Sequence, residues 1–252
     1  MHPIRCRAAL VLGLLALPAG MGGCAEDVPG PLVTSYPLQE GWSWDYRRAV
    51  EGELLNGSSD RVQQLDSARV EAVGSVTWDG QAAYSVISTV LSDGPPLLGQ
   101  DYFRQTSRDL HHVVRLTGGG DLDVLPKPGA GAPDPSWAAA SGPGPAQDPG
   151  GRTVLAYPLI PGNSWVMQVT PSLITRSVVA EERITVPAGR FETVRIETTI
   201  HGPEPLTYTD WIGQIGLVRR ELVWELDEYF FVGHPARERV HARIDLRRYT
   251  RP

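Results

Sequence analysis

A nine-residue stretch occurs twice in this chain and constrains its architecture more than any other feature. Residues 36–44 read YPLQEGWSW and residues 157–165 read YPLIPGNSW, so six of the nine positions are identical in the same register. Self-similarity of this kind indicates that one structural unit is used twice. The sequence therefore predicts two similar halves, residues 36–116 and 153–252, that belong to one domain.

Both halves show the period-two alternation that is typical of β-strands. Along residues 194–200 and 240–246, apolar side chains alternate with polar ones, which gives each strand one dry and one wet face. Asn56-Gly57 and Asp79-Gly80 are strong hairpin-turn signals between strand-like runs. No stretch after residue 23 has a sustained helical period. These patterns predict an all-β fold built from antiparallel strands.

The two halves are separated by residues 117–152, which are rich in glycine, proline and alanine. Nine glycines and seven prolines occupy these 36 residues. Such a composition buries too little apolar surface to offset the entropy that is lost on ordering. We expect a long flexible loop here. The alternative is a structured lid closed by Leu122, Val124, Leu125 and Trp137.

Residues 1–23 have the features of a secretory signal peptide. Two arginines precede an apolar run over residues 8–17, which is too short to cross a bilayer, since a spanning helix needs about 20 residues. The run leads to the sequence MGGC, which ends at Cys24 and resembles the lipobox of bacterial lipoproteins. This resemblance implies that Cys24 carries lipid and that residues 24–35 are a tether. An ordinary cleaved signal and an N-terminal membrane helix are the alternatives.

The residue after Cys24 indicates where the protein is located, and the net charge restricts the kinds of partner that it can bind. By analogy with lipoprotein sorting, Ala25 in place of an aspartate favours the outer membrane, with the domain facing the periplasm or the cell surface. The formal charge of the full chain is −6, and removing Arg5 and Arg7 leaves 21 basic against 29 acidic side chains, or −8. So acidic a surface does not favour nucleic acid. The predicted partners are the membrane, through the lipid on Cys24, and either an envelope protein or an apolar ligand.

Three motifs taken together resemble those of bacterial lipoproteins and periplasmic proteins of the TapB-like type. They are the G-x-x-W of residues 41–44, the VPAG-x-F of residues 186–191 and the G-x-x-GLVR-x-E of residues 213–221. The resemblance covers residues 36–249 and implies a curved antiparallel sheet. More distantly, it implies a half-barrel like that of the lipoprotein-localisation proteins LolA and LolB. It supplies no catalytic residues.

Sequence signatures of catalysis and of cofactor binding are absent. The chain has no nucleophile elbow, P-loop, dinucleotide fingerprint or zinc-protease motif, so we expect no enzyme, no cofactor and no metal. His111 and His112 are neighbours on a strand, so they point to opposite faces and are expected to be exposed. Asp227, Glu228 and His234 match no metal-binding spacing.

One acidic pair keeps a catalytic alternative open. Asp101 and Asp210 occupy equivalent places in the two halves, each directly before an aromatic residue. Two facing carboxylates could act as the acid and the base of a hydrolase. Otherwise each aspartate caps a turn or pairs with an arginine.

The tryptophans are the remaining candidates for a binding role. Most are expected to fill the core, but some could line an apolar groove on the concave face of the sheet. The candidates for ligand binding are Trp44, Trp78, Trp165, Trp211 and Trp224. We therefore expect a membrane-anchored, non-catalytic β-domain that binds an envelope protein. The alternative is a carrier or chaperone for a lipid or another apolar ligand.

Overall fold

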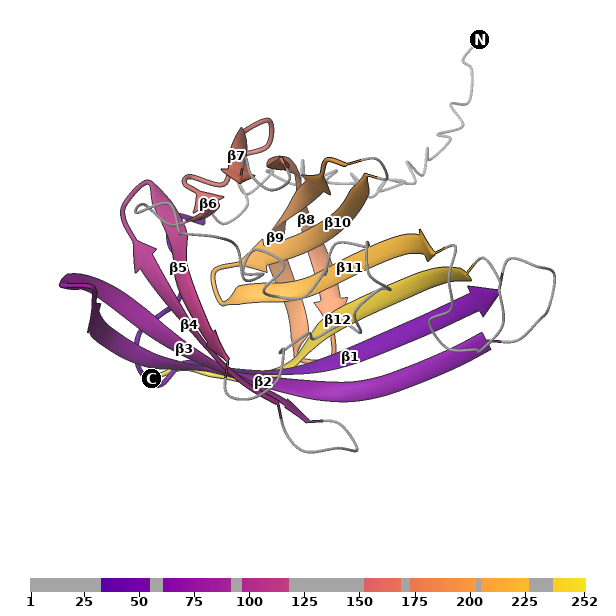
Figure 1. Ribbon diagram of the computed structural model, residues 1–252, viewed down its shortest axis with the longest axis horizontal. Coiled ribbons are helices and arrows are strands. Elements are labelled where there is room, and N and C mark those ends of the chain that lie inside the picture. The colour runs from indigo at the N-terminus through magenta and orange to yellow at the C-terminus, as the bar shows by residue number, and fades with distance from the viewer. Residues whose placement is uncertain are drawn as a thin grey trace, which may run out of the picture.

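The protein is a β-structure throughout the part that the computed structural model describes (Figure 1), namely residues 33–54, 61–91, 97–117, 152–168, 173–202, 205–226 and 238–252. The strands are β1 (Ser43–Leu54), β2 (Arg61–Trp78), β3 (Gln81–Leu91), β4 (Leu97–Gln105), β5 (Asp109–Thr117), β6 (Arg152–Ala156), β7 (Ser164–Gln168), β8 (Ile174–Val186), β9 (Gly189–Ile200), β10 (Leu206–Gly213), β11 (Gly216–Leu226) and β12 (Glu238–Thr250). The all-β prediction is confirmed. No helix long and apolar enough to cross a membrane occurs in these residues.

The predicted turns lie partly inside and partly outside the described residues. Asp79-Gly80 joins β2 to β3 as expected, and the Pro187-Ala188 turn joins β8 to β9. The Asn56-Gly57 turn, most of the loop of residues 117–152, and the cluster of Asp227, Glu228 and His234 lie outside the described part of the chain. The predictions made for these segments therefore stay predictions.

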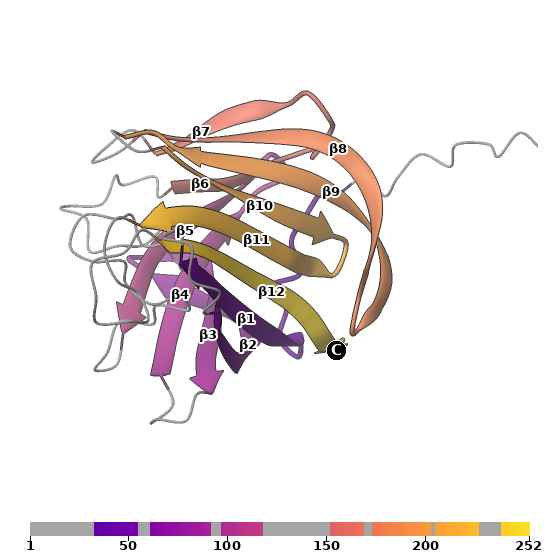
Figure 2. The ribbon, with the colours of Figure 1, turned by 90° about the vertical axis from the view of Figure 1, so that its right-hand side faces the viewer.

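All twelve strands belong to one antiparallel sheet that curls into a nearly closed barrel (Figures 1 and 2). The strand order is β6-β5-β4-β3-β2-β1-β12-β11-β10-β9-β8-β7. Each copy of the nine-residue stretch leads into the first strand of a series of six, β1 to β6 and β7 to β12, and β1 pairs with β12 to join the two series. Register shifts at Asp45/Tyr46, Ala72/Gly74 and Trp211/Ile212 bend the strands. The sheet thus curls further than the half-barrel that the resemblance implied.

The barrel closes at a seam between its two edge strands, β6 and β7. These strands lie side by side, but each pairs through its backbone only with its other neighbour in the described sheet. Side chains bridge the gap: the Trp165 indole Nε1–H donates to the carbonyl of Thr153 (3.1 Å), and Arg176 Nη1 donates to that of Val154 (2.6 Å). These bonds occupy backbone carbonyls of β6, an edge strand that could otherwise pair with another chain.

One end of the barrel is covered by the segment that precedes β1. Val33 and Leu38 are buried, and the carbonyl of Val33 accepts a hydrogen bond from the amide of Leu159 (3.2 Å). The Tyr36 amide donates to the side chain of Gln105 (2.6 Å), which also accepts from the Tyr157 hydroxyl (3.2 Å). Gln105 therefore ties together the two copies of the nine-residue stretch at this end.

The turn between β10 and β11 requires a glycine at position 216, where Tyr36 packs against the backbone. Gly216 has a φ of +95°, and a Cβ at this position would lie 3.0 Å from the ring and hydroxyl of Tyr36. The next residue, Leu217, donates its amide to the Tyr36 hydroxyl (3.2 Å). Burial raises the pKa of Tyr36 to about 12, although the Leu217 amide opposes that rise. Tyr36 is therefore a neutral side chain that seals the covered end.

Candidate binding site

The barrel interior consists of two apolar clusters with charged residues between them. The cluster near the covered end includes Trp44, Tyr46, Val178, Ile196 and Ile212, and the second cluster includes Val50, Ile174, Ile200, Tyr208 and Leu222. On each inward face a polar residue separates the two clusters. These residues are Arg48 between Tyr46 and Val50, Arg176 between Ile174 and Val178, Thr198 between Ile196 and Ile200, and Asp210 between Tyr208 and Ile212. With Asp66, Asp101, His112 and Arg220 they make up what we call the polar belt.

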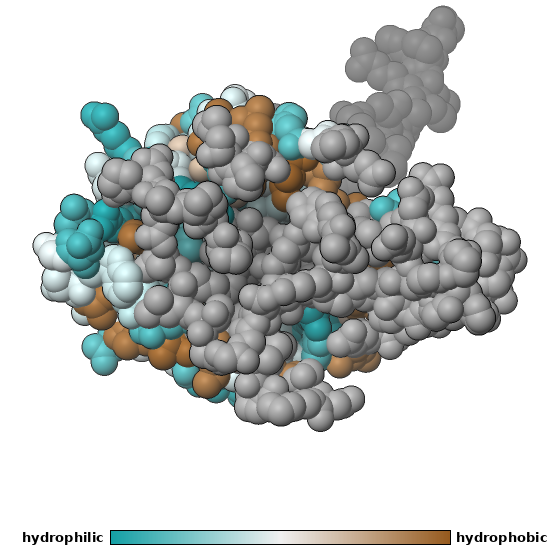
Figure 3. All heavy atoms as spheres, viewed as in Figure 1, coloured by the Kyte–Doolittle hydropathy of each residue, from teal (hydrophilic) through white to brown (hydrophobic). Residues whose placement is uncertain are grey.

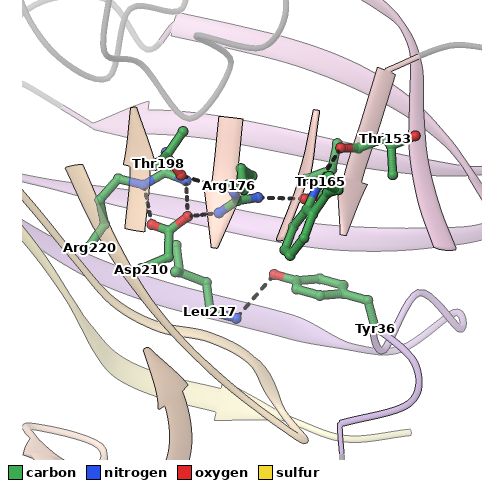
Figure 4. Close-up of polar contacts among 9 residues, drawn as sticks. Tyr36, Thr153, Trp165, Arg176, Thr198, Asp210, Leu217 and Arg220 are labelled. Atoms are coloured by element: carbon green, nitrogen blue, oxygen red, sulfur yellow. Dashed lines mark hydrogen bonds and ion pairs between the residues drawn. The ribbon is translucent and has the colours of Figure 1, made fainter. Parts of the chain in front are cut away.

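The centre of the polar belt is a triad of Arg176, Asp210 and Arg220 (Figure 4). Asp210 on β10 accepts from Arg220 Nε (2.6 Å) and Nη2 (2.9 Å) on the neighbouring strand β11, and from Arg176 Nη2 (2.5 Å) on β8. Arg176 also donates from Nε to the Thr198 hydroxyl (2.9 Å). Its Cζ lies over the Trp165 ring, 5.8 Å from the ring centroid, in a cation–π contact. Asp210 is only 1% exposed, so this network is shielded from water.

The triad fixes the charge state of its carboxylate. Burial on its own would raise the pKa of Asp210, but the charges and hydrogen bonds of Arg220 and Arg176 outweigh that effect and hold the pKa below its ordinary value. Burial would likewise lower the pKa of Arg220, but Asp210 raises it further than burial lowers it. The triad therefore contains two cations and one anion and carries a net charge of +1.

Two further pairs complete the polar belt. Asp101 Oδ1 lies 2.9 Å from His112 Nε2, on the adjacent strands β4 and β5. On the other side, Arg48 Nε donates to Asp66 Oδ1 (2.5 Å), and its Nη2 contacts Oδ2 of the same carboxylate. Arg48 Nη1 is buried and has no hydrogen-bond partner among the described residues.

The position of His112 corrects the expectation of two exposed histidines. His112 is only 6% exposed, and its imidazole packs in a T-shaped arrangement against the Phe103 ring, with the two centroids 5.2 Å apart. His111 contacts Thr153 and Asp109 instead. The prediction that the two side chains diverge is consistent with these partners. The prediction of exposure is wrong for His112, because its strand turns that face into the barrel.

A cavity of about 100 Å³ lies between the triad and the Asp101–His112 pair. Arg176, Asp210 and Arg220 line one part of its wall, and Asp101 and His112 line another. Most of the remaining wall is apolar and includes Leu38, Trp44, Val70, Val86 and Leu217. The site is therefore a small amphipathic cavity, closed on one side by the segment before β1.

The predicted tryptophans do not gather around this cavity. Trp44 lines it and donates its indole N–H to the carbonyl of Ile215 (2.6 Å), and Trp165 packs on Arg176 at the seam. Trp78 packs on Tyr102 at 4.5 Å, and Trp211 bonds to Glu182. Because Tyr102 and Trp211 follow Asp101 and Asp210 directly, both point to the opposite face of their strands. The side chain of Trp224 lies outside the described residues.

The two aspartates line the same cavity but do not form an acid–base pair. A general acid has to keep its proton near neutral pH, whereas the two arginines keep Asp210 ionised. Asp101 contacts His112. Asp210 thus pairs with arginines, as the alternative interpretation predicted, whereas the His112 contact of Asp101 was not among the expected arrangements. Among the described residues, no group of three or more His, Cys, Asp or Glu side chains could hold a metal ion.

Comparisons with known proteins give structural likeness only. No protein-family model matches the chain, and no curated protein matches it. A structure from Bacteroides fragilis, described as an exported protein with YmcC-like fold, matches at a TM-score of 0.44 and 16% identity over 87% of this chain and 100% of that one. A structure from Parabacteroides distasonis, described as a lipoprotein, matches at 0.40 and 13% over 87% of this chain and 99% of that one. At these TM-scores neither match carries an argument, and the TapB-like resemblance stays a prediction.

Most of the polar belt was not predicted from the sequence. Asp101, Asp210 and His112 were candidates, whereas Arg48, Asp66, Arg176, Thr198 and Arg220 were not. The sequence does contain a pattern that could have indicated these residues. Several of them take the place of an apolar residue in a strand whose inward face is otherwise apolar at every second position, as Arg176 does between Ile174 and Val178. A charged residue in such a place is either an error of register or a buried, paired charge.

Proposed function

We propose that the chain is a lipid-anchored protein of the bacterial outer membrane whose barrel is a non-catalytic module that binds another envelope protein. The anchor rests on the MGGC sequence that ends at Cys24. The module rests on one structural observation, a group of three exposed leucines on the outer face of the barrel. In the described interior, by contrast, the cavity beside the triad measures only about 100 Å³.

The outer leucine patch consists of Leu65, Leu91 and Leu98, which are 52%, 49% and 50% exposed. Leu91 on β3 lies opposite Ser67 on β2, so Leu65 is its diagonal neighbour on the same face. Leu98 on β4 lies opposite Thr89, and is the diagonal neighbour of Leu91 on the other side. Along the lower edge of Figure 3, where Figure 1 places β2, hydrophobic and hydrophilic side chains lie next to one another.

The surroundings of the leucine patch favour a protein as the occupant over a lipid surface. Arg69 and Glu71 continue the outer face of β2 beside the leucines and form an ion pair, and Gln100 lies on the same face of β4. An apolar centre with a mixed-charge rim is typical of protein–protein interfaces. The mature chain is also acidic, which disfavours contact with anionic headgroups.

The interior does not support the alternative of a lipid carrier. Pockets that hold drug-sized ligands measure roughly 300–1,000 Å³, whereas the cavity here measures about 100 Å³. Its walls also include two carboxylates and two guanidiniums, a charged lining that does not suit an acyl chain. We therefore place the partner on the outside of the barrel.

The anchor is tested by metabolic labelling with radioactive palmitate. Cys24→Ser should abolish incorporation of the label, because the thiol that accepts the lipid is gone, and the protein should move from the membrane to the soluble fraction. Ala25→Ser, at the next position, is the matched control and should keep the label. Label that persists in Cys24→Ser would refute the anchor.

The leucine patch is tested by a photo-crosslinking amino acid placed in the native envelope. At Leu91 it should yield one discrete protein adduct, and at Val223, which is 51% exposed on the outer face of β11, it should not. Adding Leu65→Asp and Leu98→Asp to the Leu91 probe should remove the adduct. A lipid adduct would point to the membrane instead, and an adduct that survives both aspartates, or no adduct, would contradict the proposed docking surface.

A further inference from the structure

The tryptophan side chains that the structure describes gather at one end of the barrel, the end that is covered by the segment before β1. In an antiparallel sheet every second connection lies at the same end, so the turns β2–β3, β4–β5, β8–β9 and β10–β11 lie at the covered end as well (Figure 1). Each described tryptophan lies within three residues of this end of a strand. They are Trp42 and Trp44 at the start of β1, Trp78 at the end of β2, Trp165 at the start of β7 and Trp211 near the end of β10.

Two tryptophan–tyrosine pairs bring this aromatic character to the surface. Trp42 and Tyr249 stack with their centroids 6.5 Å apart, the Trp78 and Tyr102 centroids lie 4.5 Å apart, and all four side chains are only partly buried. The guanidinium of Arg251 lies over Trp42 (5.7 Å) and over Tyr249 (5.4 Å). Tryptophan and tyrosine are enriched where a membrane meets water, because their rings are apolar at one end and polar at the other. The covered end thus has the residue types of a membrane interface.

The covered end is also electrically neutral, although the chain as a whole is acidic. Its described segments outside the strands are residues 33–42, 79–80, 106–108, 157–163, 187–188, 214–215 and 251–252. The charged side chains in these segments are Glu40, Asp79, Arg108 and Arg251, so their charges sum to zero. The net charge of −8 on the mature chain therefore lies elsewhere. A neutral end with an exposed apolar side chain, Ile160 (42% exposed), is not repelled by lipid headgroups as an acidic surface would be.

The proposed lipid anchor would attach the chain to the membrane at this same end. Val33 is buried at the covered end, where its carbonyl accepts from Leu159, and Cys24 lies nine residues before it. Nine residues span about 30 Å when they are fully extended, whereas β3 with its 11 residues is about 36 Å long. A barrel that stood on its opposite end would need this segment stretched out along the barrel wall, at a large cost in conformational entropy.

We propose that the covered end of the barrel docks on the surface of the bilayer that holds the lipid on Cys24, with the two tryptophan–tyrosine pairs at the level of the headgroups. This inference rests on the proposed lipid anchor. In this orientation the outer leucine patch faces away from the bilayer, because Leu91 is the last residue of β3 and Leu98 lies at the start of β4, both toward the opposite end. The envelope protein that binds the patch then approaches from the aqueous side.

Fluorescence quenching in vesicles tests this orientation. The lipidated full chain is inserted into preformed phosphatidylcholine vesicles with spin-labelled headgroups, and it carries an environment-sensitive dye on one introduced cysteine, since the thiol of Cys24 is taken up by the lipid. Gln214→Cys places the dye in the β10–β11 turn. Val223→Cys places it on the outer face of β11, about 23 Å along the strand from that turn. Quenching should be roughly twofold or more stronger at position 214, and equal quenching, or stronger quenching at position 223, would overturn the proposal.

Flotation of the same samples separates this inference from the anchor on which it rests. A chain that does not float with the vesicles refutes the lipid anchor, and the docking with it. A chain that floats but shows no difference between the two dye positions refutes the docking alone.

A matched pair of substitutions tests whether the covered end contacts the bilayer or only lies near it. Ile160→Asp places a carboxylate in the loop between β6 and β7, and a charged side chain is disfavoured in the apolar part of the interface. It should therefore lower the quenching of the dye at position 214 by about half. Val223→Asp changes a similarly exposed side chain on the wall of the barrel and should leave that quenching as it is. Undiminished quenching in Ile160→Asp would contradict the contact.

Discussion

Replacing Asp210 with alanine is expected to destabilise the barrel by about 3–5 kcal/mol, because the change leaves two buried guanidiniums without their shared counter-ion. Arg176 and Arg220 are 3% and 8% exposed and cannot turn to water without opening the barrel. Both direct hydrogen bonds at the carboxylate at distances of 2.5–2.9 Å. Urea unfolding followed by tryptophan fluorescence measures the loss as a lower transition midpoint.

The control for this prediction is an ion pair of the same type on the surface. Asp45 pairs with Arg248 through Nη2 at 2.6 Å, but the arginine side chain is 73% exposed. Asp45→Ala should therefore cost less than about 1 kcal/mol. If Asp45→Ala and Asp210→Ala lower the free energy of unfolding equally, then burial of the triad does not determine how much the triad contributes to stability.

The pH dependence of stability, compared between the wild type and Asp210→Asn, gives a second check. Because the folded-state pKa of Asp210 is below its ordinary value, the carboxylate stabilises the fold at every pH above the pKa of the unfolded chain. That contribution is lost as the pH falls below about 4, toward the folded-state pKa. The difference in stability between the wild type and Asp210→Asn should therefore shrink in acid and stay constant between pH 5 and 8. A difference that grows in acid would contradict the assigned charge state.

The triad also shows what kind of stabilisation to expect from the polar belt. Replacing a whole buried ion network by apolar residues of similar volume is often neutral or stabilising, whereas removing one partner is costly. The triple variant Arg176→Met, Asp210→Leu, Arg220→Met should accordingly recover most of the stability lost in Asp210→Ala.

The strand pattern was predictable because it depends on information that is local in the chain. Alternation along residues 194–200 and 240–246 sets which face of a strand is apolar, and Asp79-Gly80 sets a hairpin. In an antiparallel meander each strand pairs with its chain neighbour, so a correct set of strands and turns leads to most of the observed ladder.

Closure of the barrel was not predictable in the same way. The pairing of β1 with β12 joins residues about as far apart as the described chain allows, as in Ser43 opposite Thr250. The curl depends on bulges such as the one at Ala72/Gly74, and no local pattern specifies where an extra residue is inserted. The seam depends on Trp165 and Arg176 reaching across to β6, which the spacing of residues does not reveal.

The candidate site was predictable only in part, for a physical reason. Sequence patterns identify a buried face by its apolar residues, and a charged residue on that face is normally taken as evidence against burial. Here Arg176 and Arg220 are buried because both pair with Asp210, which lies on a third strand. This pairing of charges depends on all three side chains together, so no single residue in the sequence indicates that it is buried.

The two copies of the nine-residue stretch provide the second large prediction, because equivalent tryptophans in them have different surroundings. Trp44 is 1% exposed, and it packs against Tyr36 and Trp42 with ring centroids 6.2 and 5.8 Å away. Its indole N–H donates to the carbonyl of Ile215 (2.6 Å). Trp165 is only partly buried and makes one hydrogen bond across the seam.

Trp44→Ala should therefore cost about 3–5 kcal/mol, the range for a fully buried aromatic side chain, and Trp165→Ala about 1–2 kcal/mol, from one hydrogen bond and one cation–π contact. Urea unfolding of both variants under the same conditions measures the two losses. The two tryptophans occupy equivalent positions in the two copies of the nine-residue stretch. A difference between the two losses in stability therefore shows that the copies have different roles: the first fills the covered end of the barrel, and the second closes its seam. Equal losses would mean that the seam is packed as tightly as the covered end.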